Sequence, residues 1–490
     1  MKKLALLLAL ALLMATIPTA ALAEATELEP YELVWYTLGT PADGDAAVME
    51  KINEYLTEKF NCTLRMIASG SAEHDERLNL LINGMEKFDL CFVAQDYASY
   101  VAMEAFYPLT DLLNEYGQDI LAQYPQSLWD SVTIRGEIYA VPTHKYSCSH
   151  YYYMFNKGAA EEAGVDLSWI NGDGTKMEKW EAFKETLYAL KEADASPNGY
   201  ITNLGTGPFN ALYPTECLTG NDNEPGVVII GDDSFEGQEP GVVFNQYDTP
   251  EFEAYVRDAY AMAQAGILPL DPETTVGLAE GDIAVQNQDS MGKRLPGYEE
   301  QYGIELEAYF INYAFTNTNK IYGSMNAISA TSEDPARAMM FLNEMIASTE
   351  FANLVFYGIE GVNWNRNEDG QIEMTNPKTY NMTTWALPGF LTAEPDVSLP
   401  IDMVDRYNAF SETLIYADNM GFALDKSPIT VEMAAISNVM AEYLDPLCNG
   451  LSDPDENLPK FREALKAAGV DTVIAEIQSQ LDAWRAERDM

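Results

Sequence analysis

Strand-like and helix-like segments alternate over the first hundred residues, and this alternation restricts the fold more than any other feature. Residues 31–36, 62–67 and 88–94 are short apolar runs that predict β-strands. The stretches between them, from about 45 to 60 and from 75 to 85, carry apolar residues at helical spacing. A βαβα order predicts a parallel sheet with helices on both faces.

The carboxyl ends of the expected strands indicate where a ligand would bind. In open α/β sheets, ligands lie in the crevice outside these ends. Tyr36 and Asp43 lie at or after the end of the first strand, and Asp96 and Tyr97 follow the third. We therefore expect these four residues in a binding site.

The first 23 residues have the features of a secretory signal. Met-Lys-Lys precedes an apolar run over residues 4–17, and Ala21-Leu22-Ala23 forms a small-residue cleavage site. The apolar run is short and is followed by Pro18, which favours a cleaved signal over a membrane anchor. We expect cleavage after Ala23 and export to the periplasm or the extracellular space.

The charge of the chain is strongly negative. Asp and Glu total 77 against 28 Lys and Arg, which gives a formal net charge of −49. Such a surface repels phosphate backbones and anionic lipid, so we expect no nucleic-acid partner. Because 47% of the residues are hydrophobic, the charge does not indicate disorder. The length of 490 residues is enough for two domains.

Motifs for catalysis and metal binding are missing from the sequence. There are three histidines and no G-x-S-x-G, H-E-x-x-H or Walker A pattern. The segment from Asn365 to Gly370 mimics a calcium loop but lacks its first Asp and its terminal Glu, so we expect a β-turn there. We expect no metal and no cofactor, and three histidines leave little for His-based catalysis.

Five widely spaced cysteines show no zinc-like pairing, and a disulfide is not required. Of these, Cys62 and Cys91 lie in or beside expected strands and are most simply buried apolar side chains. The five are Cys62, Cys91, Cys148, Cys217 and Cys448.

Residues 326–364 combine helix signals with an unusual ending. A strand-like start leads to the N-cap candidates Ser332 and Asp334, with Pro335 in the first helical turn. A second short helix is capped by Ser348 and stops at Gly358. The segment I-E-G-V-N-W then places a carboxylate and an indole beside two glycines.

This segment carries a resemblance to a known family. Ser-x-x-Pro-x-x-Ala…Phe-Leu followed by Gly-Ile-Glu-Gly-x-x-Trp resembles the family 1 extracellular solute-binding proteins of bacterial ABC importers, and within them a subgroup with a C-terminal Ile-Glu-Gly-x-x-aromatic signature. Residues 136–142 (G-E-I-Y-A-V-P) are similar to the family's crossover between lobes, and residues 279–289 resemble a strand that lines the cleft.

The resemblance implies an α/β, two-lobe, periplasmic-binding-protein-like (type II) fold with an interlobe cleft and multiple hinge crossings. Residues 27–143 would form the first part of lobe 1 and residues 144–307 the first part of lobe 2. Residues 308–357 would return to lobe 1, and residues 358–490 would complete lobe 2. Many family members carry a lipid-modified Cys after the signal, but the first Cys here is Cys62, so we expect no lipid anchor.

The resemblance also implies a function. The chain would be an exported, monomeric receptor that captures a carbohydrate, an oligosaccharide, in the cleft and delivers it to the membrane subunits of an ABC importer. A receptor for a peptide or another polar solute is the alternative among binding proteins. A secreted glycan-cleaving enzyme is the alternative among enzymes. It would need two acids about 5 to 10 Å apart, and the carboxylates are too abundant for the sequence to single out such a pair.

Aromatic and polar residues near strand ends and crossovers are the candidate ligand-binding residues, because sugars offer faces for stacking and hydroxyls for hydrogen bonds. Glu360 and Trp364 belong to the family signature, and Trp364 could equally be a core anchor. The candidates are Tyr36, Asp43, Asp96, Tyr97, Tyr146, Asn287, Gln288, Tyr313, Glu360, Trp364 and Trp385.

Overall fold

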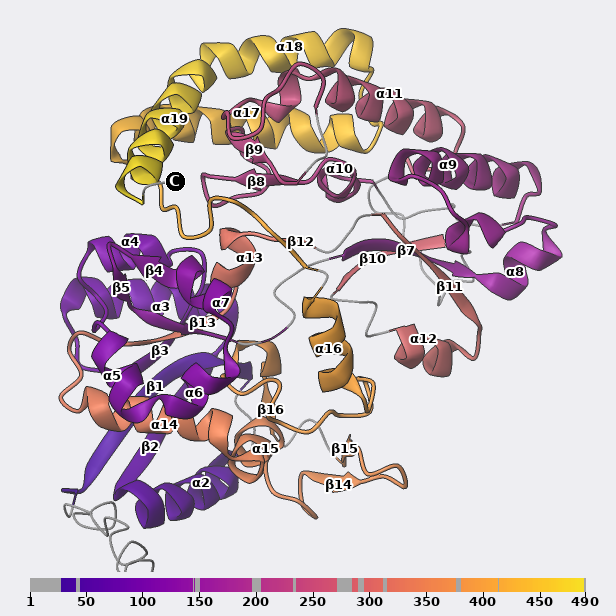
Figure 1. The fold of residues 1–490 in the computed structure, drawn as a ribbon. Helices are drawn as coiled ribbons and strands as arrows, with labels where there is room; N and C mark the ends of the chain where they lie inside the picture. The colour runs from indigo at the N-terminus through magenta and orange to yellow at the C-terminus, as the bar shows by residue number, and fades with distance from the viewer. Residues whose placement is uncertain are drawn as a thin grey trace, which may run out of the picture.

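The computed structural model describes residues 28–40, 45–143, 145, 150–195, 204–231, 235–270, 284–289, 295–311, 315–375, 380–412 and 414–488. Figure 1 shows two lobes joined near β12 and α13, with the C-terminal helices on the second lobe. None of the helices in the described ranges is both long enough and apolar enough to cross a bilayer.

The first lobe is built on a six-stranded sheet in the order β16-β1-β3-β13-β6, with β2 also paired to β1. β1 runs parallel to β2 and β3, as the alternating pattern predicts. The later strands β13 and β16 join antiparallel, so the sheet is mixed rather than parallel throughout. The strands are β1 (Tyr31–Thr40), β2 (Cys62–Ser69), β3 (Leu90–Val93), β6 (Ala140–Pro142), β13 (Met325–Ile328) and β16 (Asn381–Met382).

The two helices predicted after residue 326 begin where the sequence indicates, whereas α3 begins at Ser71, ahead of the expected start near residue 75. The Asp334 side chain accepts a hydrogen bond from the Arg337 backbone N–H (3.0 Å) and caps α14, which has Pro335 at its first position. Ser348 caps α15, and Gly358, with φ +83°, ends it. The helices are α2 (Asp45–Phe60), α3 (Ser71–Gly84), α4 (Tyr97–Ala102), α5 (Thr110–Tyr116), α6 (Gln118–Gln123), α7 (Gln126–Val132), α14 (Pro335–Ala347), α15 (Thr349–Tyr357) and α16 (Met403–Ser411).

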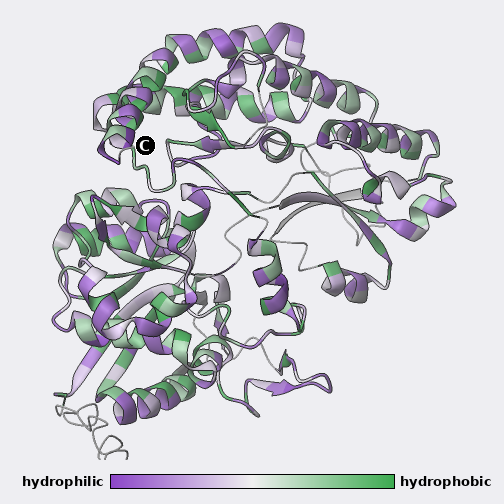
Figure 2. Cartoon of the chain, viewed as in Figure 1, coloured by the Kyte–Doolittle hydropathy of each residue, from purple (hydrophilic) through white to green (hydrophobic). Residues whose placement is uncertain are grey.

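The second lobe holds an antiparallel sheet in the order β10-β7-β11 and a hairpin of β8 and β9. Its helices turn their apolar faces inward and their polar faces to solvent, as Figure 2 shows for the outer helices. The elements are β7 (His150–Asn156), α8 (Lys157–Glu162), α9 (Lys176–Glu192), α10 (Gly207–Leu212), β8 (Thr215–Cys217), β9 (Val227–Ile229), α11 (Pro250–Gln264), β10 (Ala284–Asp289), α12 (Leu295–Tyr302), β11 (Leu306–Phe310), α17 (Thr430–Cys448), α18 (Pro454–Ala467) and α19 (Val470–Glu487).

Short pairs and connecting elements complete the chain. The hairpin of β14 and β15 has its turn at residues 367–370, as predicted, and the Asn367 side chain accepts hydrogen bonds from the backbone N–H groups of Asp369 and Gln371. The elements are β4 (Thr133–Ile134), β5 (Glu137–Ile138), β12 (Phe315–Thr316), α13 (Thr318–Tyr322), β14 (Trp364–Arg366), β15 (Ile372–Met374) and β17 (Ile415–Tyr416).

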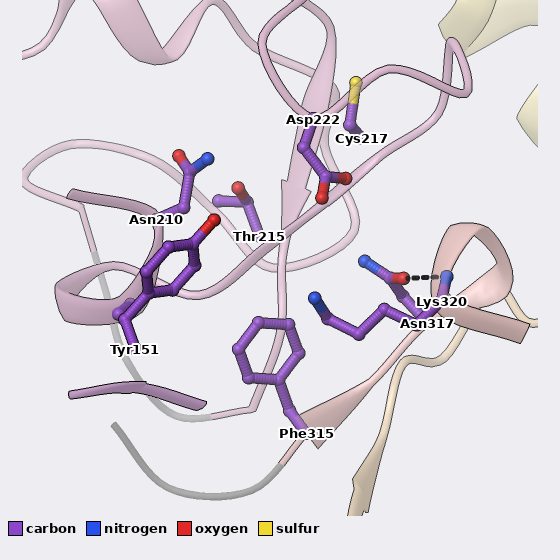
Figure 3. Close-up of a pocket in the computed structure, with 9 residues that line it drawn as sticks. Tyr151, Asn210, Thr215, Cys217, Asp222, Phe315, Asn317 and Lys320 are labelled. Atoms are coloured by element: carbon purple, nitrogen blue, oxygen red, sulfur yellow. Dashed lines mark hydrogen bonds between the residues drawn. The ribbon is translucent and has the colours of Figure 1, made fainter. Parts of the chain in front are cut away.

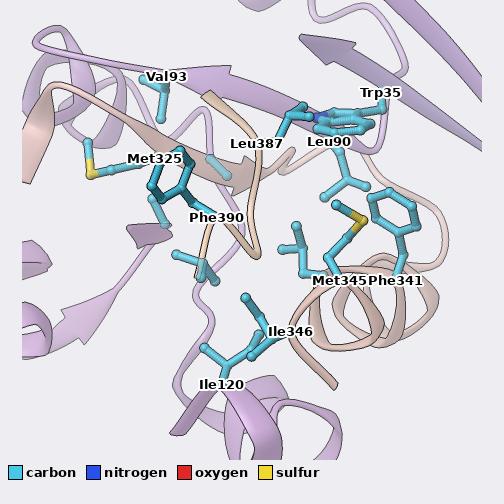
Figure 4. Packing of buried hydrophobic residues seen from close by; sticks show 14 of the residues in the cluster. Trp35, Leu90, Val93, Ile120, Met325, Phe341, Met345, Ile346, Leu387 and Phe390 are labelled. Atoms are coloured by element: carbon cyan, nitrogen blue, oxygen red, sulfur yellow. The ribbon is translucent and has the colours of Figure 1, made fainter. Parts of the chain in front are cut away.

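Each lobe has its own large hydrophobic core. In the first lobe, side chains of the sheet pack against α14 and against Leu387 and Phe390, which come from a later segment (Figure 4). Apart from Ala386, the buried hydrophobic side chains of residues 364–420 belong to this first core, and those from Phe422 onward belong to the second. This packing differs from the expected division, in which residues 358–490 return to lobe 2. Local patterns predict the elements after Gly358 but not the core against which they pack.

Two smaller expectations concern buried groups. Cys62 and Cys91 are free and buried, as expected, and so are Cys217 and Cys448, while Cys148 lies outside the described residues. His74 lies among charged residues in the sequence, which predicts a solvated side chain, but it is 1% exposed. Its Nε2 lies 2.9 Å from the Phe92 carbonyl oxygen, and burial lowers the pKa of the imidazole.

Candidate functional site

Trp385 forms an exposed aromatic platform at the carboxyl-end edge of the first-lobe sheet. Its side chain is 40% exposed, and its ring meets Phe92 of β3 edge to face, with ring centroids 5.8 Å apart. The ammonium of Lys145 lies 4.6 Å from the centre of the indole and donates to the Trp385 carbonyl oxygen (2.9 Å). Phe92 belongs with Leu38 and Ala386 to a small separate cluster. We call Trp385, Phe92 and Lys145 the Trp385 platform.

A pocket lies where the second-lobe elements meet the crossing segment of β12 and α13. Tyr151 comes from β7, Asn210 from α10 and Thr215 from β8, while Phe315 and Lys320 come from β12 and α13 (Figure 3). We call it the crossover pocket. Its lining residues are Tyr151, Asn210, Ala211, Thr215, Cys217, Asp222, Phe315, Asn317 and Lys320.

Hydrogen bonds connect the platform to the segment that carries the pocket. Ser324, which follows α13, donates through its hydroxyl to the Trp385 carbonyl oxygen (2.9 Å) and lies 3.0 Å from the Thr143 hydroxyl. The Thr143 backbone N–H donates to the Ser324 carbonyl oxygen (2.9 Å). These hydrogen bonds hold Thr143, at the first-lobe end of the first crossing between the lobes, together with Ser324 and the Trp385 segment. The platform and the pocket therefore belong to one region between the lobes.

Local sequence explains how two pocket walls are built. Gly207 begins α10 directly against the Tyr151 ring, and an added Cβ at this position would overlap that ring. The side chain of Asn317 caps α13 by accepting from the Lys320 backbone N–H (3.0 Å), which orients the short helix that bears Lys320. Figure 3 shows the ammonium of Lys320 directed into the space between Phe315, Tyr151 and Asp222.

A buried carboxylate lies beside the pocket, on the strand that forms one wall. Glu216 of β8 is 1% exposed and accepts hydrogen bonds from the Thr318 hydroxyl and the Asn419 amide, both at 3.2 Å. Burial raises the pKa of this carboxyl group, although the hydrogen bonds that it accepts oppose the shift. In the part of the chain that the structure describes, no group of three or more His, Cys, Asp and Glu residues could hold a metal ion.

Some predicted site residues lie in or near this region. Trp385 forms the platform, and Asp96 is exposed at the start of α4, just beyond the carboxyl end of β3. Asn287 and Gln288 lie in β10, where Gln288 pairs with the pocket residue Tyr151 in register. Tyr36 of β1, by contrast, is half-buried and contacts Phe88, which lies just before the amino end of β3, edge to face.

Other predicted residues lie elsewhere. Tyr97 is fully buried (0% exposed), and its hydroxyl donates to the Val132 carbonyl oxygen (2.6 Å). Trp364 is 3% exposed in the first core, where its Nε1 donates to the Gly358 carbonyl oxygen (3.0 Å), so the packing agrees with the core-anchor interpretation. Glu360 is exposed and 3.6 Å from Arg366, outside both platform and pocket. Three further candidates lie outside the described residues: Asp43, Tyr146 and Tyr313.

None of the residues that line the crossover pocket was among the predicted site residues. Asn210 and Lys320 lie in helices of six and five residues and Asp222 lies in a turn, and these segments are too short to show a periodic pattern. Tyr151 had a usable signal, because it belongs to a tyrosine run directly after the expected first crossing. Gly207-Pro208 marks the start of a short helix, but only the three-dimensional fold shows that the glycine admits the Tyr151 ring.

Comparisons with known proteins agree with this architecture. The model of the family described as bacterial extracellular solute-binding protein matches residues 39–349, more than half of the chain's 490 residues. A domain of unknown function (DUF3502) matches residues 418–486. A carbohydrate ABC transporter substrate-binding protein of Streptococcus pneumoniae is 22% identical over 463 residues, covering 92% of this chain and 90% of that protein.

Solved structures with the same fold are similar over nearly the full length. The N-glycan transport solute binding protein NgtS of Streptococcus pneumoniae has a TM-score of 0.79 at 20% identity, covering 94% of this chain and 100% of that one. A human-milk-oligosaccharide-binding solute binding protein of Bifidobacterium longum infantis has a TM-score of 0.60 at 14% identity, covering 93% and 99%. These likenesses establish the mixed α/β solute-binding fold, and with the family match they show that the chain belongs to the bacterial extracellular solute-binding proteins.

Proposed function

We propose that this protein is a receptor that binds an oligosaccharide between its two lobes and delivers it to an ABC importer. The observation that carries the proposal is a hydrogen-bonded connection between the exposed indole residue Trp385 on the first lobe and the crossing segment, which lines a pocket together with the second lobe.

The chemistry of this region suits a sugar. Trp385, Tyr151 and Phe315 supply aromatic surface for the C–H faces of a pyranose, and the pocket adds amide, hydroxyl, ammonium and carboxylate groups. A sugar hydroxyl both donates and accepts hydrogen bonds, so this mixture can satisfy several neighbouring hydroxyls. The proposal retains Asp96, Asn287, Gln288 and Trp385 as ligand-binding candidates, along with Tyr36, Tyr146, Tyr313 and Asp43.

The comparisons support a carbohydrate ligand. The curated relative is a carbohydrate ABC transporter substrate-binding protein. NgtS has been solved in complex with Man1GlcNAc and with Man5GlcNAc, and the Streptococcus pneumoniae protein FusA with kestose. The family binds solutes rather than transforming them, which argues against the glycan-cleaving alternative.

We also propose that the lobes close on the ligand by bending at their crossings. The first lobe would comprise residues 27–143 and about 315–421, and the second would comprise 150–311 and about 422–490. The boundary near residue 421 is supported by the packing, because Met420 belongs to the first core and Phe422 to the second. Closure requires contacts that form only in the closed state with ligand bound.

Export and partners complete the proposal. Residues 1–23 would be a signal peptide cleaved after Ala23, without a lipid anchor, and the mature receptor would act as a monomer that presents both lobes to membrane subunits of the importer. Intact-mass measurement of the secreted protein tests the cleavage site, and a mass that includes diacylglycerol would contradict it.

A binding screen tests the function directly. Thermal shift against mannose–N-acetylglucosamine oligosaccharides, human milk oligosaccharides, fructans and peptides should single out a glycan, and calorimetry should then give saturable binding without a cleaved product. Small-angle scattering should show a smaller radius of gyration at saturation. Stabilisation by peptides alone, or release of shortened glycans, would overturn the proposal.

A further inference from the structure

Two opposite charges face each other across the crossover pocket. Lys320, on α13, is half-buried with its ammonium 5.1 Å from the centre of the Phe315 ring. Asp222 lies on the turn between β8 and β9, and its Oδ1 accepts a hydrogen bond from the Asn319 amide at 3.4 Å. Figure 3 shows both charged groups directed into the pocket beside the Tyr151 hydroxyl.

Neither charge is neutralised by an ion pair among the residues that the structure describes. Other lysines in those residues do contact a carboxylate, among them Lys51, Lys59, Lys157 and Lys184. Such contacts are expected in a chain with 77 acidic and only 28 basic residues. Among the described residues, no carboxylate lies within 4.0 Å of the Lys320 ammonium group. Lys320 is half-buried, and a partly desolvated charge is costly unless a partner hydrogen-bonds to it, whereas Asp222 is exposed to solvent.

The chemistry of the two groups defines what would bind them. An ammonium group only donates hydrogen bonds, and an ionised carboxylate only accepts them. A sugar hydroxyl near Lys320 can therefore serve as acceptor while a neighbouring hydroxyl donates to Asp222. A carboxylated sugar would satisfy Lys320 but would place a second negative charge in the pocket with Asp222, and the net charge of −49 adds repulsion at long range.

We propose that Lys320 and Asp222 are a specificity-determining pair, which recognises neighbouring hydroxyls of a neutral sugar and makes the receptor reject acidic sugars. The inference rests on the proposed function and goes beyond it, because it assigns the class of sugar and the residues that select it. Lys320 can donate hydrogen bonds to a neutral or to an acidic sugar. Asp222 distinguishes the two classes, because its carboxylate repels the carboxylate of an acidic sugar.

The test compares matched neutral and acidic tetrasaccharides that differ only at C6. Mannotetraose with tetramannuronate, cellotetraose with tetraglucuronate and galactotetraose with tetragalacturonate form such pairs, and titration calorimetry gives each affinity. The wild type should bind at least one neutral member and none of the acidic ones comparably. Asp222→Asn should weaken the neutral sugar about 10-fold or more, as expected for loss of a charge-assisted hydrogen bond, and should strengthen its acidic counterpart. Lys320→Met, which keeps the stem over Phe315, should weaken both.

Control variants and contrary outcomes distinguish a failure of the Lys320–Asp222 pair from a failure of the proposed function. Asp173→Asn and Lys426→Met make the same charge changes at exposed positions outside the pocket and should leave all affinities unchanged. Melting curves of the ligand-free variants establish that each one folds. A wild type that binds no sugar of either class would overturn both this pair and the proposed function. Two outcomes would overturn the role of the Lys320–Asp222 pair and leave the proposed function standing. One is that both variants bind the sugar as tightly as the wild type, and the other is that the wild type prefers the acidic sugars.

Discussion

The amide of Asn419 donates to the buried carboxylate of Glu216. This contact joins β8 of the second lobe to the segment around Asn419, before which buried side chains pack in the first core and after which they pack in the second. The Oδ1 atom of Asn419 accepts from Arg485 at 2.8 and 3.2 Å, so its amide nitrogen is left to face Glu216. The Thr318 hydroxyl, which also donates to Glu216, accepts from the Gly421 backbone N–H (3.1 Å). One carboxylate thus holds two crossing segments.

This arrangement predicts a pH-dependent stability difference between the wild type and Glu216→Gln. Glutamine can still accept from Asn419 while it donates to the Thr318 hydroxyl, so the substitution removes mainly the charge. Burial raises the pKa of Glu216 above its ordinary value of 4.5, so the folded protein binds this proton more tightly than the unfolded chain. The corresponding stabilisation is complete below pH 4.5 and is lost as the pH rises through the raised pKa.

Melting temperatures measured across this pH range check the prediction. The wild type should lose stability relative to Glu216→Gln as the pH rises from about 4 toward neutrality. Glu463→Gln, at an exposed position on α18, should show no such trend against the wild type. A wild-type to Glu216→Gln difference that is constant with pH would mean that the carboxylate is not the titrating group.

Gly207→Ala is expected to weaken ligand binding through Tyr151. The added Cβ would overlap the Tyr151 ring, so the ring must move toward the pocket or the helix must shift. Overpacking of this kind costs about 1–3 kcal/mol of stability, and the displaced ring would occupy space that the ligand needs. Calorimetric titration with the glycan found in the screen, beside a melting curve, measures both effects.

Gly158→Ala is the matched control, because Gly158 lies in the first turn of α8, another short second-lobe helix. An added Cβ there would approach only the Asn156 side-chain oxygen, at 3.8 Å. This variant should retain both affinity and stability. Full affinity in Gly207→Ala would contradict the expected obstruction of the pocket by the Tyr151 ring.

The sequence allowed much of the fold to be predicted where local signals decide the structure. The caps Asp334 and Ser348, the stop at Gly358 and the hairpin turn after Arg366 all lie where their side chains or backbone preferences indicate. The core to which a segment belongs is not a local property. His74 shows the same limit, because charged neighbours in sequence say nothing about the Phe92 carbonyl group that it meets in the interior.

The candidate site was less accessible to prediction for the same reason. Trp385 was found because an aromatic side chain near a strand end is a plausible stacking group, and it is exposed. Tyr97 meets the same criterion and is buried. Asp222 and Lys320 come together from segments almost a hundred residues apart, and their pairing depends on how β8 and α13 meet.

Trp364→Ala is expected to destabilise the protein. The indole is buried in the first core and donates to the Gly358 carbonyl oxygen, so truncation removes apolar contacts and leaves a buried acceptor without its partner. A core substitution of this size costs roughly 3–5 kcal/mol. Chemical denaturation measures the loss, and affinity of the remaining folded protein for glycan should be unchanged. A variant with wild-type stability and weakened binding would instead place the indole against the ligand.

Trp385→Ala is expected to have the opposite pattern, since the indole is 40% exposed and rests with one edge on Phe92. If a sugar ring stacks on it, its loss should weaken glycan binding by roughly 1–3 kcal/mol, as for other aromatic stacking platforms. The free energy of unfolding should change little, because the carbonyl oxygen that Ser324 and Lys145 contact belongs to the backbone and survives the substitution. Trp385→Phe retains an aromatic face and should recover part of the affinity. Titration and denaturation of both variants separate the contributions, and a Trp385→Ala variant that binds glycan as tightly as the wild type would remove the platform from the site.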